Sequence, residues 1–309
     1  MLYTKVYKDI LKYLFSTNDF SQLSIGNGYP YPLDLGFTLE DESFYYHPQD
    51  KDGVPYRLYQ SVGKQYNPTR IAAYALANFN CYALYNYDSC FEIFLKCADW
   101  FLGIEDARYE YHFDWSDLKA PWISSMAQGE AASVLIRAYK ITGDEKYLKH
   151  AKLSLEPLFV RIGSGGVQSL LPDGSLFVEE YPSRNPTHVL NGFLYALIGL
   201  GEYAEITESK RHKDLFRQLS LSVCTNIDIW CHGRWSLYED RIKAKGLNFC
   251  TPSYHNLQIT QLKWLNARVN DPEIEKTINA WEKGLGNLWT RLFAFAGKAY
   301  FRLKNRAQR

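Results

Sequence analysis

The stretch "WISSMAQGEAASVLIRAYKITGDEKYLKHAKLSLEPLFV", residues 122–160, predicts two consecutive helices. Its apolar residues recur at helical spacing on both sides of a short polar break, "TGDEKY". In that break Gly143 can end the first helix and Asp144 can cap the second. Because the break is short, we expect the two helices to fold back on each other as an antiparallel pair.

The same alternation of helix, short loop and helix recurs along the chain. It predicts helices at residues 186–208, 210–231, 253–269 and 272–295, and earlier ones that begin with "YNPTRIAAYALANF" and at residues 89–103. Between the pairs lie segments with strand character. In "GGVQSLLPDGSLFVEEYP" the Asp173–Gly174 pair marks a hairpin turn, and "GRWSLYEDRI" has a strand pattern.

These patterns predict a mainly α protein: an α/α barrel or incomplete toroid of antiparallel helix pairs, with inserted β-hairpins and a small N-terminal β region. We expect residues 1–60 to form an N-terminal helix and a small β arm, and residues 61–309 to form an α/α catalytic domain. One large helical ring can take this length without splitting. Functional groups are expected on the loops at the ends of the helices.

The composition excludes several classes of partner. With 35 Lys and Arg against 34 Asp and Glu, the chain carries no excess charge that would recruit nucleic acid or an anionic membrane. No apolar run has the length of a signal peptide core or a membrane span. The six cysteines form no CxxC pair and mostly fall in apolar helical patterns. That favours reduced thiols, and hence a cytoplasmic protein.

Aromatic content is high, with 24 Tyr, 17 Phe and 8 Trp making up 16% of the chain. Rings with a polar tip suit carbohydrate clefts, because a flat ring covers a sugar face while its hydroxyl bonds the rim. Large helical cores also use many aromatic residues, and composition alone leaves both interpretations open.

The motifs point to acid-base chemistry. The seven histidines form no HExxH pair, no serine lies in GxSxG, and "GSGG" at 163–166 does not join a strand to a helix, so we expect no metal and no cofactor. Three places carry proton-transfer groups next to breaks between predicted elements: Glu179 with Glu180 and Tyr181; Tyr238 with Arg241; and Tyr254 with His255. Taken singly, each of these tyrosines is better explained as part of a core.

Four runs, in this order, resemble the C-terminal catalytic region of the D-glucuronyl C5-epimerases that act on heparosan: "PWISSMAQGEAASVLIRAYKITGDEKYL", "VEEYPSRNPTHVLNGFLYALIGLGEY", "LYEDR" and "YHNLQITQL". Together with "QYNPTRIAAYALANF" the resemblance covers about residues 55–268, and it suggests a short bacterial homologue. The family commonly has a second histidine one turn after its tyrosine-histidine pair, where this chain has Gln258.

The resemblance implies an isomerase that removes and returns the C5 proton of a glucuronate residue, giving L-iduronate. Glu180 and Tyr254 would be the two bases on opposite faces, and Arg241 would neutralise the uronate carboxylate, which otherwise opposes loss of the C5 proton. The implied catalytic residues are Glu180, Tyr181, Tyr238 and Tyr254; the implied substrate-binding residues are Arg241, His255, Arg184, Asn191, Tyr66 and Gln128.

Other functions stay open at this level. A polysaccharide lyase would begin with the same proton abstraction and then expel the substituent at C4. A non-catalytic carbohydrate-binding toroid would use its aromatic residues only for stacking. A glycosidase is less favoured, because it wants two carboxylates across the bond and the sequence offers one well-placed acid motif. The expected partners are an anionic uronate polysaccharide and a second copy of the chain in a homodimer.

Overall fold

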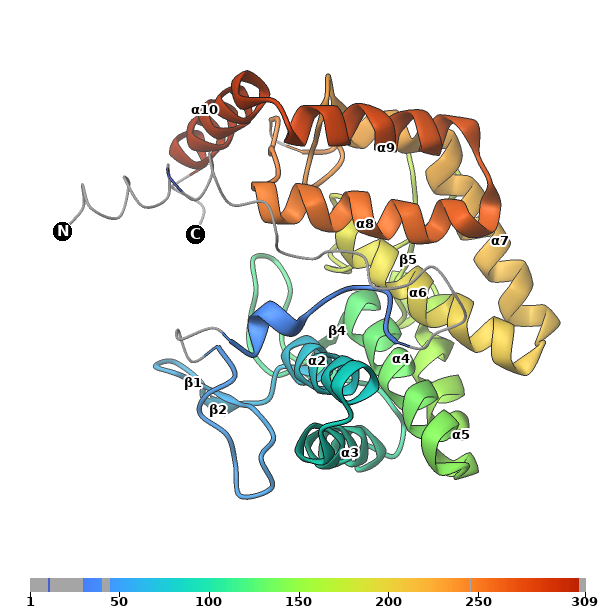
Figure 1. Ribbon diagram of the computed structural model, residues 1–309. Helices are drawn as coiled ribbons and strands as arrows, with labels where there is room; N and C mark the ends of the chain where they lie inside the picture. The colour runs from blue at the N-terminus through green and yellow to red at the C-terminus, as the bar shows by residue number, and fades with distance from the viewer. Residues whose placement is uncertain (1–10, 12–29, 41–44, 245, 306–309) are drawn as a thin grey trace.

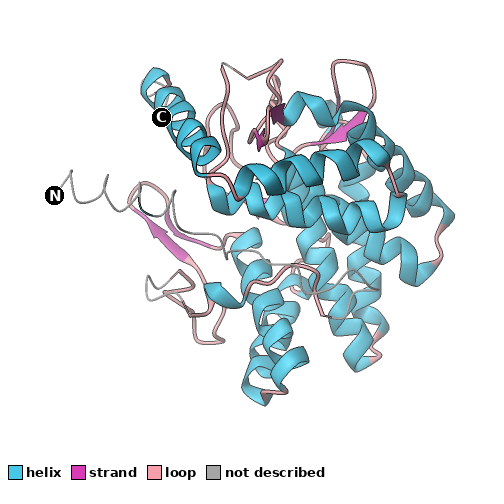
Figure 2. Cartoon of the chain, turned by 45° about the horizontal axis from the view of Figure 1, so that its top comes forward, coloured by secondary structure: helices cyan, strands magenta, loops and turns pink. Residues whose placement is uncertain are grey.

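The computed structural model describes residue 11 and residues 30–40, 45–244 and 246–305. The N-terminal helix expected from the sequence falls almost entirely outside these ranges. Within them the chain is mainly helical (Figures 1 and 2). Its helices are α2 (Pro68–Tyr85), α3 (Asp88–Leu102), α4 (Ser125–Thr142), α5 (Glu145–Leu155), α6 (Leu190–Thr207), α7 (Lys210–Asn226), α8 (Pro252–Val269), α9 (Pro272–Leu285) and α10 (Leu288–Lys304).

All strands in the described part of the chain belong to short antiparallel hairpins. They are β1 (Arg57–Tyr59) with β2 (Gly63–Gln65), β3 (Glu110–Tyr111) with β4 (Trp122–Ile123), β5 (Gln168–Leu170) with β6 (Leu176–Val178), and β7 (Cys231–His232) with β8 (Trp235–Ser236). Helix pairs with inserted hairpins confirm the predicted fold class, as an incomplete toroid rather than a closed barrel. The N-terminal β region is the β1–β2 hairpin, which spans the boundary expected at residue 60.

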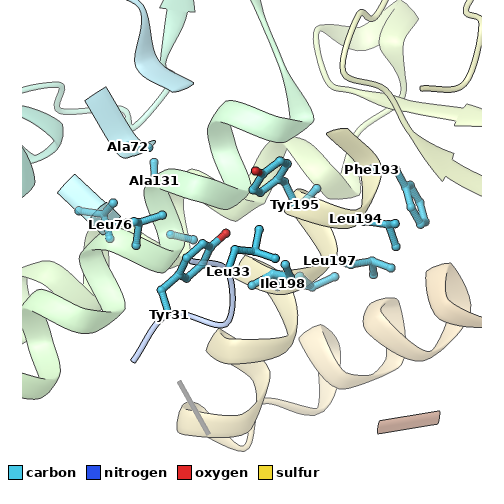
Figure 3. Close-up of a cluster of buried hydrophobic side chains, with 14 of the residues drawn as sticks. Tyr31, Leu33, Ala72, Leu76, Ala131, Phe193, Leu194, Tyr195, Leu197 and Ile198 are labelled. Carbon is cyan, nitrogen blue, oxygen red and sulfur yellow. The ribbon is translucent and has the colours of Figure 1, made fainter. Parts of the chain in front are cut away.

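The centre of the molecule is the contact between α4 and α6 (Figure 1). A Cβ atom added at Gly129 of α4 would lie 2.9 Å from the carbonyl oxygen of Tyr195. A Cβ atom added at Gly199 of α6 would lie 2.9 Å from the Cα of Gly129. The two backbones therefore touch, and only glycine fits at either position. Around this contact Tyr31, residues of α2 and the inner face of α6 form the core shown in Figure 3.

Several local predictions are confirmed. Gly143 ends α4 in the left-handed conformation with φ +72°, and the Asp144 side chain accepts a hydrogen bond from the backbone N–H of Lys146 at the start of α5. The Asp173–Gly174 turn connects β5 and β6, and the "GRWS" segment forms the β7–β8 hairpin.

Three helix boundaries were wrong. The helix expected from residue 186 begins at Leu190, because residues 187–190 instead bond to the segment around Tyr238. Helix α7 ends at Asn226 rather than 231 and continues as a 3₁₀ turn, Ile227–Trp230. The helix expected at 272–295 is two helices. It breaks before Asn287, whose side chain accepts a hydrogen bond from the backbone N–H of Thr290 and caps α10.

None of the described helices is both long enough and apolar enough to cross a bilayer.

Candidate active site

Three distant segments bring Glu180, Tyr238 and Tyr254 together. Glu180 follows β6, Tyr238 follows β8, and Tyr254 lies in the first turn of α8, where the Thr251 hydroxyl accepts a hydrogen bond from its backbone N–H. The Tyr238 hydroxyl donates to Oε1 of Glu180 at 3.4 Å. The rings of Tyr238 and Tyr254 have centroids 5.8 Å apart and meet edge to face at 73°. We call Glu180, Tyr238 and Tyr254 the proton-transfer group.

Glu180 is buried, with 7% of the residue exposed. Space for it depends on Gly192 in the first turn of α6, since a Cβ atom there would lie 2.6 Å from the Cβ of Glu180. Burial raises the pKa of Glu180 to about 7, with a smaller increase from the charge of Glu179. Hydrogen bonds from Tyr181 and Tyr238 act in the opposite direction on the same pKa. A carboxyl poised near neutrality suits proton transfer at physiological pH.

The tyrosines of the site are weak acids. Burial, and then the charge of Glu180, raise the pKa of Tyr181, Tyr238 and Tyr254 well above the ordinary value. Tyr254 is 41% exposed as a residue, yet its hydroxyl has lost much of its solvation. At neutral pH all three hydroxyls therefore carry their protons, and in this resting state they are donors rather than bases.

The two arginines implied as substrate-binding residues lie on the loops next to the proton-transfer group. Arg184 is exposed between β6 and α6. Arg241 is engaged on the surface: its guanidinium pairs with Asp228 at 3.0 Å and donates to the carbonyl oxygen of Cys231 at 3.3 Å. Part of the Arg241 guanidinium is therefore occupied by protein groups.

Gln128 and His255 are fully buried supports. The Gln128 amide bonds backbone groups of Ala107, Tyr109 and Ser154. The His255 ring contacts Ser236 and the Trp281 carbonyl oxygen through its two nitrogens and stacks on Trp235 with centroids 4.0 Å apart. Both residues hold the fold around the site and present no exposed surface.

Asn191 and Tyr66 occupy different parts of the molecule. Asn191 is buried at the start of α6, and its Oδ1 has no hydrogen-bond partner among the described residues. Tyr66, after β2, donates to Asp50 at 2.6 Å and lies under the Lys64 ammonium.

The structure adds residues that the motifs did not single out. Glu130 of α4 is buried, and one of its oxygens lacks a hydrogen-bond partner in the described part of the chain; burial, and then Glu180, raise its pKa well above the ordinary value. Lys298 of α10 lies with its Nζ 5.7 Å from the centre of the Tyr238 ring and donates to Asn248 at 2.6 Å. Glu130 lies in the "MAQGE" run, so the sequence motif could have indicated it. Lys298 lies in none of the motifs, so nothing in the sequence indicated its place beside the site.

Aromatic side chains lie next to the proton-transfer group, and we call Tyr111, Trp115, Trp122 and Tyr181 the aromatic wall. Tyr181 lies between Trp122, with ring centroids 6.1 Å apart, and Trp115, with centroids 6.4 Å apart and ring planes 25° from parallel. Trp122 stacks in turn on Tyr111. Trp115 is 53% exposed, and mutual backbone hydrogen bonds with Leu118 hold it on a short turn. This arrangement offers one open ring face next to the buried acid.

Among the described residues no three His, Cys, Asp or Glu side chains are placed to hold a metal ion. The site offers a carboxyl with a pKa near 7, phenolic proton donors and an aromatic surface.

The part of the chain that carries the site matches a known protein family. The family model described as "D-glucuronyl C5-epimerase C-terminus" matches residues 102–283, which include the whole proton-transfer group. A D-glucuronyl C5-epimerase of Caenorhabditis elegans is 34% identical over 174 residues, covering 52% of this chain and 28% of that protein. An uncharacterized protein of Methanocaldococcus jannaschii is 28% identical over 179 residues, covering 57% of this chain and 56% of its own length. The match thus spans little more than a quarter of the first relative and about half of the second. With well over half of its residues matched by the family model, the chain belongs to the D-glucuronyl C5-epimerase C-terminal family.

Proposed function

We propose that the chain is an isomerase that epimerises D-glucuronate to L-iduronate residues at C5 in a heparosan-like polysaccharide. The observation that carries the proposal is the meeting of a carboxyl with a pKa near 7 and two protonated phenols from three separate segments of the chain. Inversion at carbon needs a proton acceptor on one face and a proton donor on the other. Glu180 and Tyr254 supply that pair, joined through Tyr238.

In the proposed mechanism ionised Glu180 takes the C5 proton, and the electron pair of the C5–H bond moves toward the uronate carboxylate as an enolate. Tyr254 then gives its phenolic proton to the opposite face of C5, which restores the carboxylate with inverted configuration. Glu180 releases its proton, and Tyr254 regains one from solvent. Tyr238 donates to Glu180 and holds its carboxylate in place.

The intermediate carries a second negative charge, so a cation near the substrate carboxylate is required. Arg241 fits this role if its guanidinium exchanges Asp228 for the substrate. Lys298 already lies beside Tyr238. We propose that both contribute, with Lys298 supplied by a helix outside the matched family region.

The proposal is tested by incubating the protein with non-sulfated heparosan in deuterated water. We expect deuterium at C5, conversion of some glucuronate to iduronate, and chains of unchanged length, measured by NMR and size separation. Shortened chains with an unsaturated, ultraviolet-absorbing end would identify a lyase instead. The absence of both deuterium and cleavage would indicate a binding protein. Exchange on a different uronate polymer would overturn only the assignment of heparosan as the substrate.

The aromatic wall predicts how the polymer is bound. Trp115→Ala removes the exposed ring next to Tyr181, on which we expect a sugar ring beside the reacting one to stack. Such a contact contributes on the order of 1 kcal/mol, so we expect KM for long chains to rise about fivefold. We expect kcat to change by less than about twofold, because the stacking is the same in ground state and transition state.

The matched control is Trp289→Ala, which removes a 79% exposed ring at the start of α10. Steady-state kinetics on long heparosan chains should show KM unchanged in this variant. An equal rise in KM for both variants, or none for Trp115→Ala, would exclude the stacking site.

A further inference from the structure

A second group of ionisable side chains lies directly behind the proton-transfer group, in the interior of the protein. Oε1 of Glu179 lies 2.6 Å from Nδ1 of His188, and Oδ2 of Asp240 lies 3.6 Å from Nε2 of the same ring. The Ser169 hydroxyl also donates to Glu179. None of the three ionisable residues is more than 1% exposed. We call Glu179, His188 and Asp240 the buried triad.

The placement of the triad decides how its protons are distributed. An ionised carboxylate only accepts hydrogen bonds, so a ring nitrogen that faces one is favourable when it carries a proton. Both nitrogens of His188 face carboxylate oxygens, and the facing Nε2 and Oδ2 atoms have no hydrogen-bond partners among the described residues. A bare Nε2 would set its lone pair against the Asp240 carboxylate. The arrangement therefore favours an imidazolium between two carboxylates, since it gives both ring nitrogens a proton to donate and leaves no buried charge without an opposite charge beside it.

The chain around the triad joins the segments that carry the reacting groups. Glu179 directly precedes Glu180, and Asp240 follows Tyr238 by two residues. His188 lies in the loop before α6 with φ +52°, a backbone conformation that is uncommon for residues other than glycine. Hydrogen bonds link the backbone N–H of Asp240 to the Thr187 carbonyl oxygen at 3.0 Å and the backbone N–H of Leu190 to the Tyr238 carbonyl oxygen at 3.3 Å.

We propose that His188 is a positioning residue that stays doubly protonated and ties the segment of Glu180 to the segment of Tyr238. The kinetic consequence of this inference rests on the proposed function, whereas the charge state of His188 does not. The 3.4 Å contact between Tyr238 and Glu180 joins two loops, and the His188 ring contacts Glu179 of one loop and Asp240 of the other. Without the imidazolium, Glu179 and Asp240 lose the cation that both contact. We expect the distance between Glu180 and Tyr238 to increase as a result.

The charge state is tested by ¹⁵N NMR of protein labelled at histidine, with the His188 signals assigned through His188→Gln. At about pH 8 we expect both ring nitrogens of His188 to be protonated, because both face carboxylates. His212 is the internal control: it is also buried, bonds Ser209 at 2.7 Å, and burial lowers its pKa. It should show one bare nitrogen. A bare ring nitrogen on His188 at this pH would overturn the proposal.

The positioning role is tested by kinetics of C5 exchange. We expect His188→Gln to lower kcat about a hundredfold, as expected for displaced reacting groups, with KM within about threefold of wild type. The control His212→Gln removes an equally buried ring from α7 and should leave kcat and KM unchanged. Equal kcat for His188→Gln and wild type would overturn the positioning role.

A second variant covers the case in which His188→Gln does not fold. Asp240→Asn keeps the oxygen that accepts from the backbone N–H groups of Ile242 and Lys243 and removes one charge. We expect it to expose a bare nitrogen on His188 and to lower kcat about tenfold. If the wild-type protein exchanges no C5 proton on any uronate polymer, the proposed function fails. The NMR measurement of the His188 ring nitrogens then still tests the proposed charge state by itself.

Discussion

Glu180→Gln is expected to lower C5 exchange about a thousandfold while making the folded protein more stable at alkaline pH. The rate falls because an amide cannot accept the C5 proton, and a positioned general base contributes about this much. Stability rises because the pKa of Glu180 is raised by burial to about 7, so above that pH the protein carries a buried ionised carboxylate. Removing that cost is worth about 2 to 3 kcal/mol.

The pH dependence gives the sign of this effect. Because the folded-state pKa of Glu180 is above the unfolded value, its protonated form adds stability at low pH, and this contribution is lost as pH rises through about 7. The variant should therefore gain most over wild type at about pH 8 and nothing at about pH 4, as measured by denaturant unfolding. In the wild-type protein kcat/KM should fall about tenfold per pH unit below 7, since in the proposed mechanism only ionised Glu180 accepts the C5 proton.

A variant that keeps wild-type exchange would remove Glu180 from the mechanism. Equal stability of the two proteins at about pH 8 would show that the carboxyl is not desolvated in solution. Ser183→Ala, three residues later in the same loop, changes a buried hydroxyl without touching the carboxyl and serves as a control for both measurements.

Tyr254→Phe is expected to lower turnover at least about a hundredfold with little change in stability. In the proposed mechanism the hydroxyl donates the proton to the face of C5 opposite Glu180, and no other described phenol lies at the start of α8. The residue is 41% exposed, so loss of one hydroxyl leaves no large cavity. The measurement is iduronate formation in single turnover, together with thermal unfolding.

Exchange of the C5 proton in Tyr254→Phe distinguishes the roles of the two faces of C5. If Glu180 still removes the proton, deuterium should return to glucuronate without formation of iduronate, because only the Glu180 face remains active. Tyr85→Phe, at the exposed end of α2, is the control and should behave as wild type. Normal iduronate formation by Tyr254→Phe would contradict its assigned role.

The local pattern of the sequence was enough to determine most of the fold. Gly143 and Asp144 mark a break between helices by backbone conformation and capping, which depend on neighbours in sequence. The Asp173–Gly174 turn is local in the same way. The predicted helix boundaries were wrong where the chain forms hydrogen bonds with segments distant in sequence. Residues 187–190 have a helical pattern, but the backbone N–H of Leu190 bonds the carbonyl oxygen of Tyr238, so α6 starts later.

The sequence by itself determined which chemical groups the site could use, since "EEYP", "LYEDR" and "PSYHN" carry an acid and phenols next to helix or strand ends. Their meeting was decided by the tertiary structure, because Glu180 and Tyr238 are 58 residues apart and approach only through packing around α6. The same packing buries Glu180 and so raises its pKa, leaves the site phenols protonated, and gives His255 and Gln128 buried partners. It also brings Lys298 from the last helix beside Tyr238. Burial and distance between remote groups are properties of the packed chain, and no local pattern encodes them.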